Sequence, residues 1–313
     1  MKLIKKSLLT VFAAFVAIFS FSAEPDEEYS SSEPAKTKID PFDGLKIQIT
    51  GILTPGEDYS GTFEVVNPSY SPSTFYYKLS VEPFSVNEKY EPVYENNGDY
   101  NQIVNWIELE SETGSIEPNE TVHINFTVHT PATAPAGGQY AVIRVASDYD
   151  MMAKENENSL NIQNIMTIAH ILYAEVAGET ERGGEILDTK VPSFLFSGNI
   201  SGSAITKNTG NVHSDGTYTL QVFPLFSKEE IYTNEESPLT RTIIPEATRT
   251  SVVTWEETPN VGIFHVIFNA DFEGAHSTVD KYVIICPLWL LFIIILAIFL
   301  IVFKILSGKK KKE

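Results

Sequence analysis

An alternation of apolar and polar residues with a period of two is the feature that most constrains the fold of this chain. It is clearest in residues 121–129 (TVHINFTVH) and in residues 75–82 (FYYKLSVE). A period of two places one face of a β-strand in a core and the other face in water. Turn-forming sequences, such as residues 54–56 (TPG) and 97–99 (NGD), separate runs of this kind. The middle of the chain is therefore predicted to consist of short strands, as in β-sandwiches.

The alternating region also repeats itself. When the chain is displaced by 141 residues, seven positions within one short stretch carry the same residue in both copies. The identical pairs are Gly61 and Gly202, Asn67 and Asn208, Ser73 and Ser214, Tyr77 and Tyr218, Leu79 and Leu220, Val81 and Val222, and Pro83 and Pro224. Further along, the turn at Pro118 parallels the turn at Pro245. The repeat predicts two copies of one sandwich, with Leu79 and Leu220 at equivalent buried positions.

We therefore expect an all-β protein with two tandem Ig-like β-sandwich domains plus one C-terminal transmembrane helix. The first sandwich is predicted for residues 41–178 and the second for residues 179–282, with the boundary in the Gly-rich, charged stretch 178–184. The first domain contains two long polar excursions, residues 85–101 and residues 148–161. Long loops on a rigid sandwich are a frequent place for binding sites.

The N-terminal end has the organisation of a secretory signal. Three lysines precede an apolar run from Leu8 to Phe21, and small residues lie at the end of this run, at Ser20 and Ser22. Residues 1–22 are predicted to be a signal peptide, cut near Ser22 or Ala23. An uncleaved anchor is the alternative, although the run is short for a membrane span. Residues 23–40 are acidic and poor in apolar side chains, which predicts a flexible leader.

The C-terminal end has the organisation of a membrane anchor. Residues 283–303 form an uncharged apolar run of 21 residues. At about 1.5 Å per residue, a helix of this length matches the roughly 30 Å hydrocarbon core of a bilayer. Residues 304–313 are rich in lysine, which predicts a cytoplasmic tail by the positive-inside rule. The protein is thus expected in the cell membrane as a single-pass protein with its N-terminal region outside the cell.

Charge and composition exclude several classes of function. Asp and Glu number 41 against 22 Lys and Arg, for a net charge of −19. A nucleic-acid partner requires a basic surface and is therefore not expected. A single cysteine rules out a disulfide framework. The six histidines show no metal-ligand spacing, and no nucleophile elbow, phosphate-binding loop or dinucleotide fingerprint is present. We expect no enzymatic activity, no cofactor and no metal site.

A set of motifs in the first predicted domain resembles a known family. It comprises a Pro-Gly-Glu turn at 55–57, an Asn-centred turn at 65–67, a Trp-Ile pair at 106–107, a Pro-Asn-Glu turn at 118–120, and the sequence APAGGQY at 134–140. Together they resemble the DUF916 family, the N-terminal domain of WxL-interacting proteins, over roughly residues 41–178. The resemblance implies a bacterial surface protein with two Ig-like domains and one C-terminal span. It also implies peptidoglycan binding by the first domain and WxL surface proteins as partners.

The excursion at residues 85–101 carries the predicted binding site. It combines three tyrosines with amide and carboxylate side chains, namely Tyr90, Tyr94, Tyr100, Asn96, Asn97 and Asp99. Tyrosine rings stack on the faces of sugar rings, and amides and carboxylates form hydrogen bonds with sugar hydroxyls. The alternative is that these aromatic residues pin the excursion to its own sandwich.

Two functions therefore remain open after the sequence analysis. The first is a membrane-anchored bacterial cell-surface protein that binds cell-wall glycan or another surface protein through its Ig-like domains. The second is a structural spacer or surface-assembly scaffold that binds no small ligand.

Overall fold

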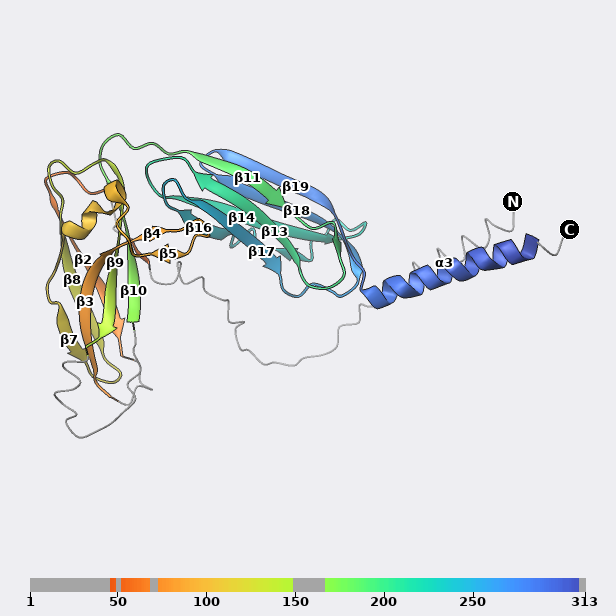
Figure 1. The fold of residues 1–313 in the computed structure, drawn as a ribbon, viewed down its shortest axis with the longest axis horizontal. Coiled ribbons are helices and arrows are strands. Elements are labelled where there is room, and N and C mark those ends of the chain that lie inside the picture. The colour runs from red at the N-terminus through yellow and green to blue at the C-terminus, as the bar shows by residue number, and fades with distance from the viewer. Residues whose placement is uncertain (1–45, 49–51, 68–72, 149–166, 310–313) are drawn as a thin grey trace.

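The computed structural model describes residues 46–48, 52–67, 73–148 and 167–309. The predicted signal peptide (1–22) and flexible leader (23–40) lie outside these residues, as does most of the polar excursion 148–161. The described chain consists mainly of strands, which confirms the expected all-β class. The strands form two stacks that follow each other along the molecule (Figure 1).

The first stack contains two facing sheets. One has the order β1-β10-β9-β3-β7, and the other has the order β2-β8-β6. The strands are β1 (Lys46–Gln48), β2 (Asp58–Val66), β3 (Phe75–Pro83), β6 (Ile107–Leu109), β7 (Thr113–Ile116), β8 (Thr121–His129), β9 (Gly137–Ser147) and β10 (Thr167–Val176). Their inward-facing residues, including Phe63, Leu79 and Phe126, form one buried apolar cluster.

The second stack also contains two sheets. One has the order β11-β13-β17, and the other has the order β12-β19-β18-β14-β15, with β16 also paired to β14. The strands are β11 (Gly184–Lys190), β12 (Phe194–Leu195), β13 (Ile200–Asn208), β14 (Ser214–Pro224), β15 (Tyr232–Thr233), β16 (Leu239–Ile243), β17 (Thr248–Trp255), β18 (Gly262–Phe272) and β19 (Ala275–Ile285). A second apolar cluster, which includes Leu220, fills the space between them.

The sequence repeat corresponds to a repeat in structure. Strand β3 contains Tyr77 and Leu79, and strand β14 contains Tyr218 and Leu220. Leu79 is 3% exposed and Leu220 is fully buried, so the prediction of equivalent buried positions is confirmed. The segment between β10 and β11, residues 177–183, joins the two stacks.

The excursion at residues 85–101 contains regular structure, which its polar, turn-rich sequence does not predict. A short hairpin forms from β4 (Ser85–Val86) and β5 (Pro92–Val93), and a 3-10 helix, η1 (Gly98–Asn105), follows it. In Figure 1 the hairpin extends from the first stack toward the second.

The C-terminal apolar run divides between a strand and a helix. Val283 to Ile285 complete strand β19, where Val283 pairs with Phe264, and helix α3 (Leu288–Lys309) begins after Pro287. The helix therefore starts five residues later than the predicted start at residue 283, because the register with β18 holds the first part of the run in the sheet. Among the described residues, no helix combines the length and the hydropathy needed to cross a membrane.

Candidate functional site

Tyr90, at the turn of the β4–β5 hairpin, is buried against the second domain. Its hydroxyl donates a hydrogen bond to the backbone carbonyl of Thr242 at 2.7 Å and accepts one from the backbone amide of Ile244 at 3.3 Å. The guanidinium of Arg249 lies 4.6 Å from the ring centre and donates to the same Thr242 carbonyl at 2.9 Å. Only 7% of Tyr90 is exposed, so its ring cannot stack on a sugar as predicted. It instead joins the hairpin to strand β16.

Tyr100 also lies close to the contact between the two domains. Its ring centre lies 6.4 Å from that of Tyr140, which is 1% exposed. Burial raises the pKa of Tyr100, and the carboxylates of Glu246 and Asp99 raise it further. Tyr140 belongs to a buried cluster that spans both domains, formed by Phe84, Tyr140, Val142, Ile171 and Tyr173 from the first and Ile244 from the second. The outward face of strands β9 and β10 is thus covered by Phe84 and Tyr100 of the first domain together with Ile244 of the second.

The other four predicted site residues remain exposed. Tyr94 lies beneath the guanidinium of Arg144, at 4.8 Å from the ring centre. Asn96 accepts a hydrogen bond from the backbone amide of Gly98, and the backbone carbonyl of Asp99 accepts one from Gln139. The backbone amide of Asn97 donates to the side-chain oxygen of the buried Asn101. The structure therefore divides the six residues between an interdomain contact and a solvated edge.

Asn211 fixes the segment that joins the domains. Its side-chain oxygen accepts a hydrogen bond from the backbone amide of Glu181 at 2.8 Å, and its side-chain nitrogen donates to the Glu179 carbonyl at 3.0 Å. Its own carbonyl accepts from the amide of Gly138 at 2.8 Å. At Gly137, where φ is +116°, an added Cβ would lie 2.8 Å from this carbonyl oxygen. Glycine is therefore required where β9 meets the second domain.

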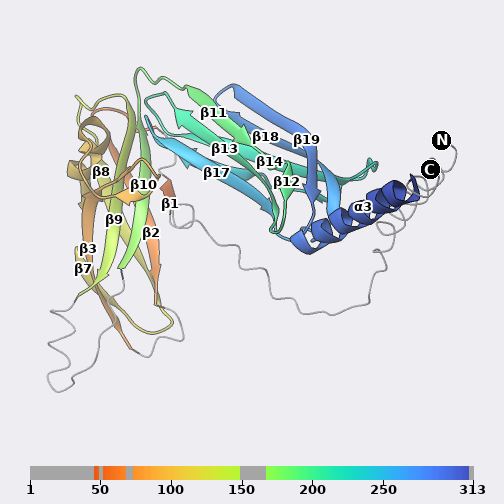
Figure 2. The same cartoon turned by 45° about the vertical axis from the view of Figure 1, so that its right-hand side comes forward.

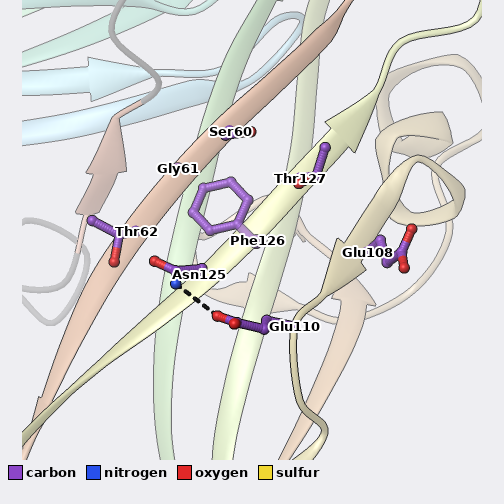
Figure 3. Close-up of a pocket in the computed structure, with 8 residues that line it drawn as sticks. All are labelled: Ser60, Gly61, Thr62, Glu108, Glu110, Asn125, Phe126 and Thr127. Atoms are coloured by element: carbon purple, nitrogen blue, oxygen red, sulfur yellow. Dashed lines mark hydrogen bonds between the residues drawn. The ribbon is translucent and has the colours of Figure 1, made fainter.

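An open groove lies on the outer face of the β2–β8–β6 sheet (Figure 3). Its volume is about 610 Å³, and it is lined by Ser60, Gly61, Thr62, Glu108, Glu110, Asn125, Phe126 and Thr127. The strand register places Thr62 opposite Asn125 and Ser60 opposite Thr127. Asn125 donates a hydrogen bond to the carboxylate of Glu110 at 2.6 Å.

Gly61 explains how a buried ring can lie at the floor of this groove. It pairs with Phe126 across the two strands, and a Cβ on Gly61 would lie 2.4 Å from the Phe126 ring. Phe126 is only 2% exposed, so the groove offers no open aromatic surface. Its hydroxyl, amide and carboxylate groups can hold a ligand through hydrogen bonds rather than through stacking.

His129 extends the polar face beyond the groove. Its Nδ1 lies 2.9 Å from a carboxylate oxygen of Asp58, and its Nε2 lies 2.9 Å from one of Glu108. Hydrogen bonding to Asp58, followed by hydrogen bonding to Glu108, raises the pKa of His129. The two acids engage opposite ring nitrogens, and no group of three acidic, histidine or cysteine residues suited to a metal ion occurs within the described ranges.

The sequence alone predicted neither the groove nor the residues of the second domain that contact Tyr90. The groove had a signal: the polar phase of the alternating strand 121–129 carries short hydroxyl, amide and imidazole side chains. Arg249, which is 4% exposed, gave no signal, because its partner Tyr90 lies in the other domain.

No family model matches the chain, and no curated protein matches it. Among solved structures, the chain is similar to the class 5 fimbriae chaperone CfaA, with 14% identity over 77% of this chain and 97% of that chain, at a TM-score of 0.34. It is similar to the E. coli chaperone DraB, with 11% identity over 76% of this chain and 94% of that chain, at a TM-score of 0.33. It is also similar to PapD-like domain 7 of human CEP192, with 14% identity over 50% of this chain and 99% of that chain, at a TM-score of 0.28. Each is a weak similarity of fold and assigns no activity to this chain.

Proposed function

We propose that this chain is a membrane-anchored cell-surface binding protein without enzymatic activity. In this proposal helix α3 is the anchor, although its described residues alone do not combine the length and hydropathy of a membrane span. The second sandwich is the base, and the first sandwich is the binding head. The ligand of the head is cell-wall glycan or a polar segment of another surface protein. The observation that carries the proposal is an open polar groove on one sandwich of a chain whose other end is an uncovered apolar helix.

The anchor is supported by the side chains of α3. Apolar residues are exposed on all sides of this helix, including Leu288, Trp289, Phe292, Ile293, Ile295, Leu296, Ile298, Phe299, Leu300, Val302 and Phe303. A helix that is apolar on every side requires a lipid or protein environment, since water cannot solvate it. Lys304 and the lysines at 309–312 follow the apolar run in the sequence, which favours a cytoplasmic C-terminus.

The head is supported by the chemistry of the groove. Ser60, Thr62 and Thr127 supply hydroxyls, which both donate and accept hydrogen bonds, whereas the carboxylates of Glu108 and Glu110 only accept them. A glycan presents hydroxyl donors along its length, and a basic or amide-rich protein segment presents N–H donors. Both ligands match a groove in which acceptors predominate.

Sedimentation with insoluble peptidoglycan tests the proposal. The detergent-solubilised full chain should sediment with the wall polymer or be retained by membranes that contain its surface partner. The double variant Glu110→Gln/Asn125→Ala should lose retention, because it removes one acceptor and the amide bonded to it. The control, Glu185→Gln/Thr250→Ala, changes one exposed carboxylate and one exposed polar side chain on the second sandwich and should be retained normally. Equal retention of both variants would rule out the groove.

A structural spacer is the second candidate, and the interdomain contact favours it. Tyr90 and the cluster around Tyr140 hold the two sandwiches in one orientation, which suits a rigid stalk. A spacer requires no ligand at the groove. If the unaltered chain is retained by neither peptidoglycan nor partner-containing membranes, the spacer replaces the binding protein as the better account.

A further inference from the structure

The end of the second sandwich nearest α3 carries several exposed apolar side chains. Strand β12 runs parallel to the end of β19, with Phe194 paired to Ile284, and lies beside the start of the helix (Figure 2). Phe194, Phe196 and Ile284 are all exposed, and the two phenylalanine rings lie 4.9 Å apart. Phe226, beyond the end of β14, is 94% exposed.

These residues occupy one level of the sheet. The register β12-β19-β18-β14 aligns Phe194, Ile284 and Ile263, and the backbone amide of Leu225 donates to the carbonyl of Ile263. Phe226 therefore lies at the same end of the sheet as Ile285, two strands away from it. We call Phe194, Phe196, Phe226 and Ile284 the apolar collar.

The polarity of the outer face changes in order along β19. Moving away from the helix, the outward-facing positions are Ile284, Tyr282, Asp280 and Thr278. Successive outward positions on a strand are about 7 Å apart. The face thus passes from apolar to amphipathic to charged over about 14 Å. Tyrosine and tryptophan are enriched at the headgroup level of membranes. In the sequence, Tyr282 precedes the collar residue Ile284 and Trp289 follows it.

The connection to α3 keeps the collar close to the start of the helix. Only Cys286 and Pro287 separate β19 from the helix, and the amide of Cys286 is still bonded to Leu195 of β12. Four residues span at most about 14 Å, so Ile284 cannot lie farther than this from Leu288. If α3 enters a bilayer at Leu288, the collar reaches the interfacial layer.

We propose that the apolar collar rests on the outer surface of the membrane that α3 enters, with its phenylalanine side chains at the boundary between headgroups and acyl chains. This inference rests on the proposed membrane anchor. Continuity with the helix and the polarity gradient of β19 select a lipid surface as the occupant. The contact is apolar rather than electrostatic, because the segment after Phe226 carries two acids, Glu229 and Glu230, and only one base, Lys228. It therefore favours zwitterionic over anionic lipid.

Fluorescence quenching in vesicles tests the collar. Cys286 is the only cysteine, so a Cys286→Ser chain allows single labelling after Phe194→Cys or Phe226→Cys. The full chain is reconstituted in phosphatidylcholine vesicles that contain nitroxide-labelled lipid. Fluorophores at 194 and 226 should lose intensity, and less so when phosphatidylglycerol is added. The control, Thr278→Cys, lies on the same face of β19 but about 20 Å farther up the strand, and its fluorescence should not change.

The outcomes separate the collar from the anchor. Alkaline carbonate washing of the same vesicles first shows whether the chain is embedded. If the chain resists extraction and neither probe is quenched, the collar is wrong and the anchor stands. Energy transfer between fluorophores on different copies, without quenching by lipid, would identify a second copy of the chain as the occupant. This result would also overturn the collar. If carbonate removes the chain, both proposals fail. Quenching at 194 and 226 but not at 278, in resistant vesicles, supports the collar.

Discussion

The two sandwiches share one arrangement of hydrogen bonds around a buried asparagine, which we call the corner. They differ in the segments that are inserted into each domain. In the first, the side-chain nitrogen of Asn67 donates to the carbonyls of Ser73 at 3.0 Å and Ile116 at 2.9 Å. In the second, that of Asn208 donates to the carbonyls of Val212 and Ile243, both at 2.8 Å. The two asparagines are 1% and 0% exposed. The repeated asparagine thus performs the same task twice, fastening a loop and a strand end to the core.

The same corner also repeats in the backbone. The amide of Asn67 donates to the carbonyl of Glu120, and that of Asn208 donates to the carbonyl of Ala247. A residue with positive φ follows the proline of each turn, Asn119 at 67° and Glu246 at 62°. The sequence repeat therefore corresponds to the same turn and the same backbone hydrogen bond in both domains.

The difference between the domains lies between β3 and β7 and between β14 and β16. The first domain inserts the β4–β5 hairpin, helix η1 and strand β6 there, whereas the second inserts only β15. The larger insertion supplies Phe84, Tyr90 and Tyr100, which meet the second domain. The repeated part of the sequence therefore contributes to both cores, whereas the unrepeated insertion adds Ile103 and Trp106 to the first core and also joins the two domains.

Leu79→Ala and Leu220→Ala are the strongest test of this equivalence. Each change should lower the free energy of unfolding by roughly 2–5 kcal/mol, since it removes a buried side chain and leaves a cavity. Because the two leucines belong to separate clusters, each change should act mainly on one domain. Hydrogen exchange resolved by domain measures this. A single cooperative transition shifted equally by both changes would contradict separate cores.

Asn67→Ala and Asn208→Ala test the shared corner directly. Asn67→Ala removes two side-chain hydrogen bonds and Asn208→Ala removes three. Each change should cost roughly 1–3 kcal/mol of unfolding free energy. Urea unfolding of the two variants measures the loss. Asn96→Ala, which changes an exposed asparagine, is the control and should stay within about 0.5 kcal/mol of the parent. A loss in only one of the two domains would break the equivalence that the repeat suggests.

Tyr90→Phe and Tyr94→Ala test the role of the insertion. Tyr90→Phe leaves the ring but removes the bond to Thr242, so it should weaken the interdomain contact by about 1 kcal/mol. Tyr94→Ala removes a ring that lies under the guanidinium of Arg144 and should cost at most about 1 kcal/mol. Small-angle scattering should show a wider range of domain orientations for Tyr90→Phe alone. Loss of ligand retention in Tyr90→Phe with unchanged scattering would reinstate Tyr90 as a binding residue.

The sequence predicted what local periodicity can specify. Alternation identified the strands, and the repeat located Leu79 and Leu220 in matching cores. Periodicity could not show that strand β9 is buried on both faces, because the residues that cover its outward face, Phe84, Tyr100 and Ile244, come from the insertion and from the other domain. It also could not separate Tyr90 from Tyr94, because both lie in a polar, turn-rich sequence. The structure separates them, since Tyr90 contacts Thr242 of the second domain and Tyr94 lies under Arg144. The membrane anchor and the ligand remain predictions.

pH offers the smallest and most selective comparison, between two histidines of the first sandwich. Hydrogen bonds to Asp58 and then Glu108 raise the pKa of His129, whereas burial beside Phe63 lowers the pKa of His170. The ordinary pKa of histidine is about 6.5. The contribution of His129 is therefore complete below about pH 6.5 and is lost as the pH rises through its raised pKa.

The contribution of His170 has the opposite sign. Its folded pKa lies below the unfolded value, so the unfolded chain binds more protons in acid, and stability falls as the pH drops below about 6.5. Urea unfolding across this range should show that His129→Gln destabilises the chain only on the acid side, by a small amount because the ring is exposed. His170→Gln should flatten the acid-side loss. If His129→Gln were equally destabilising on the alkaline side, the protonated ring would not be the source of its contribution, and the two carboxylates would merely lie beside it.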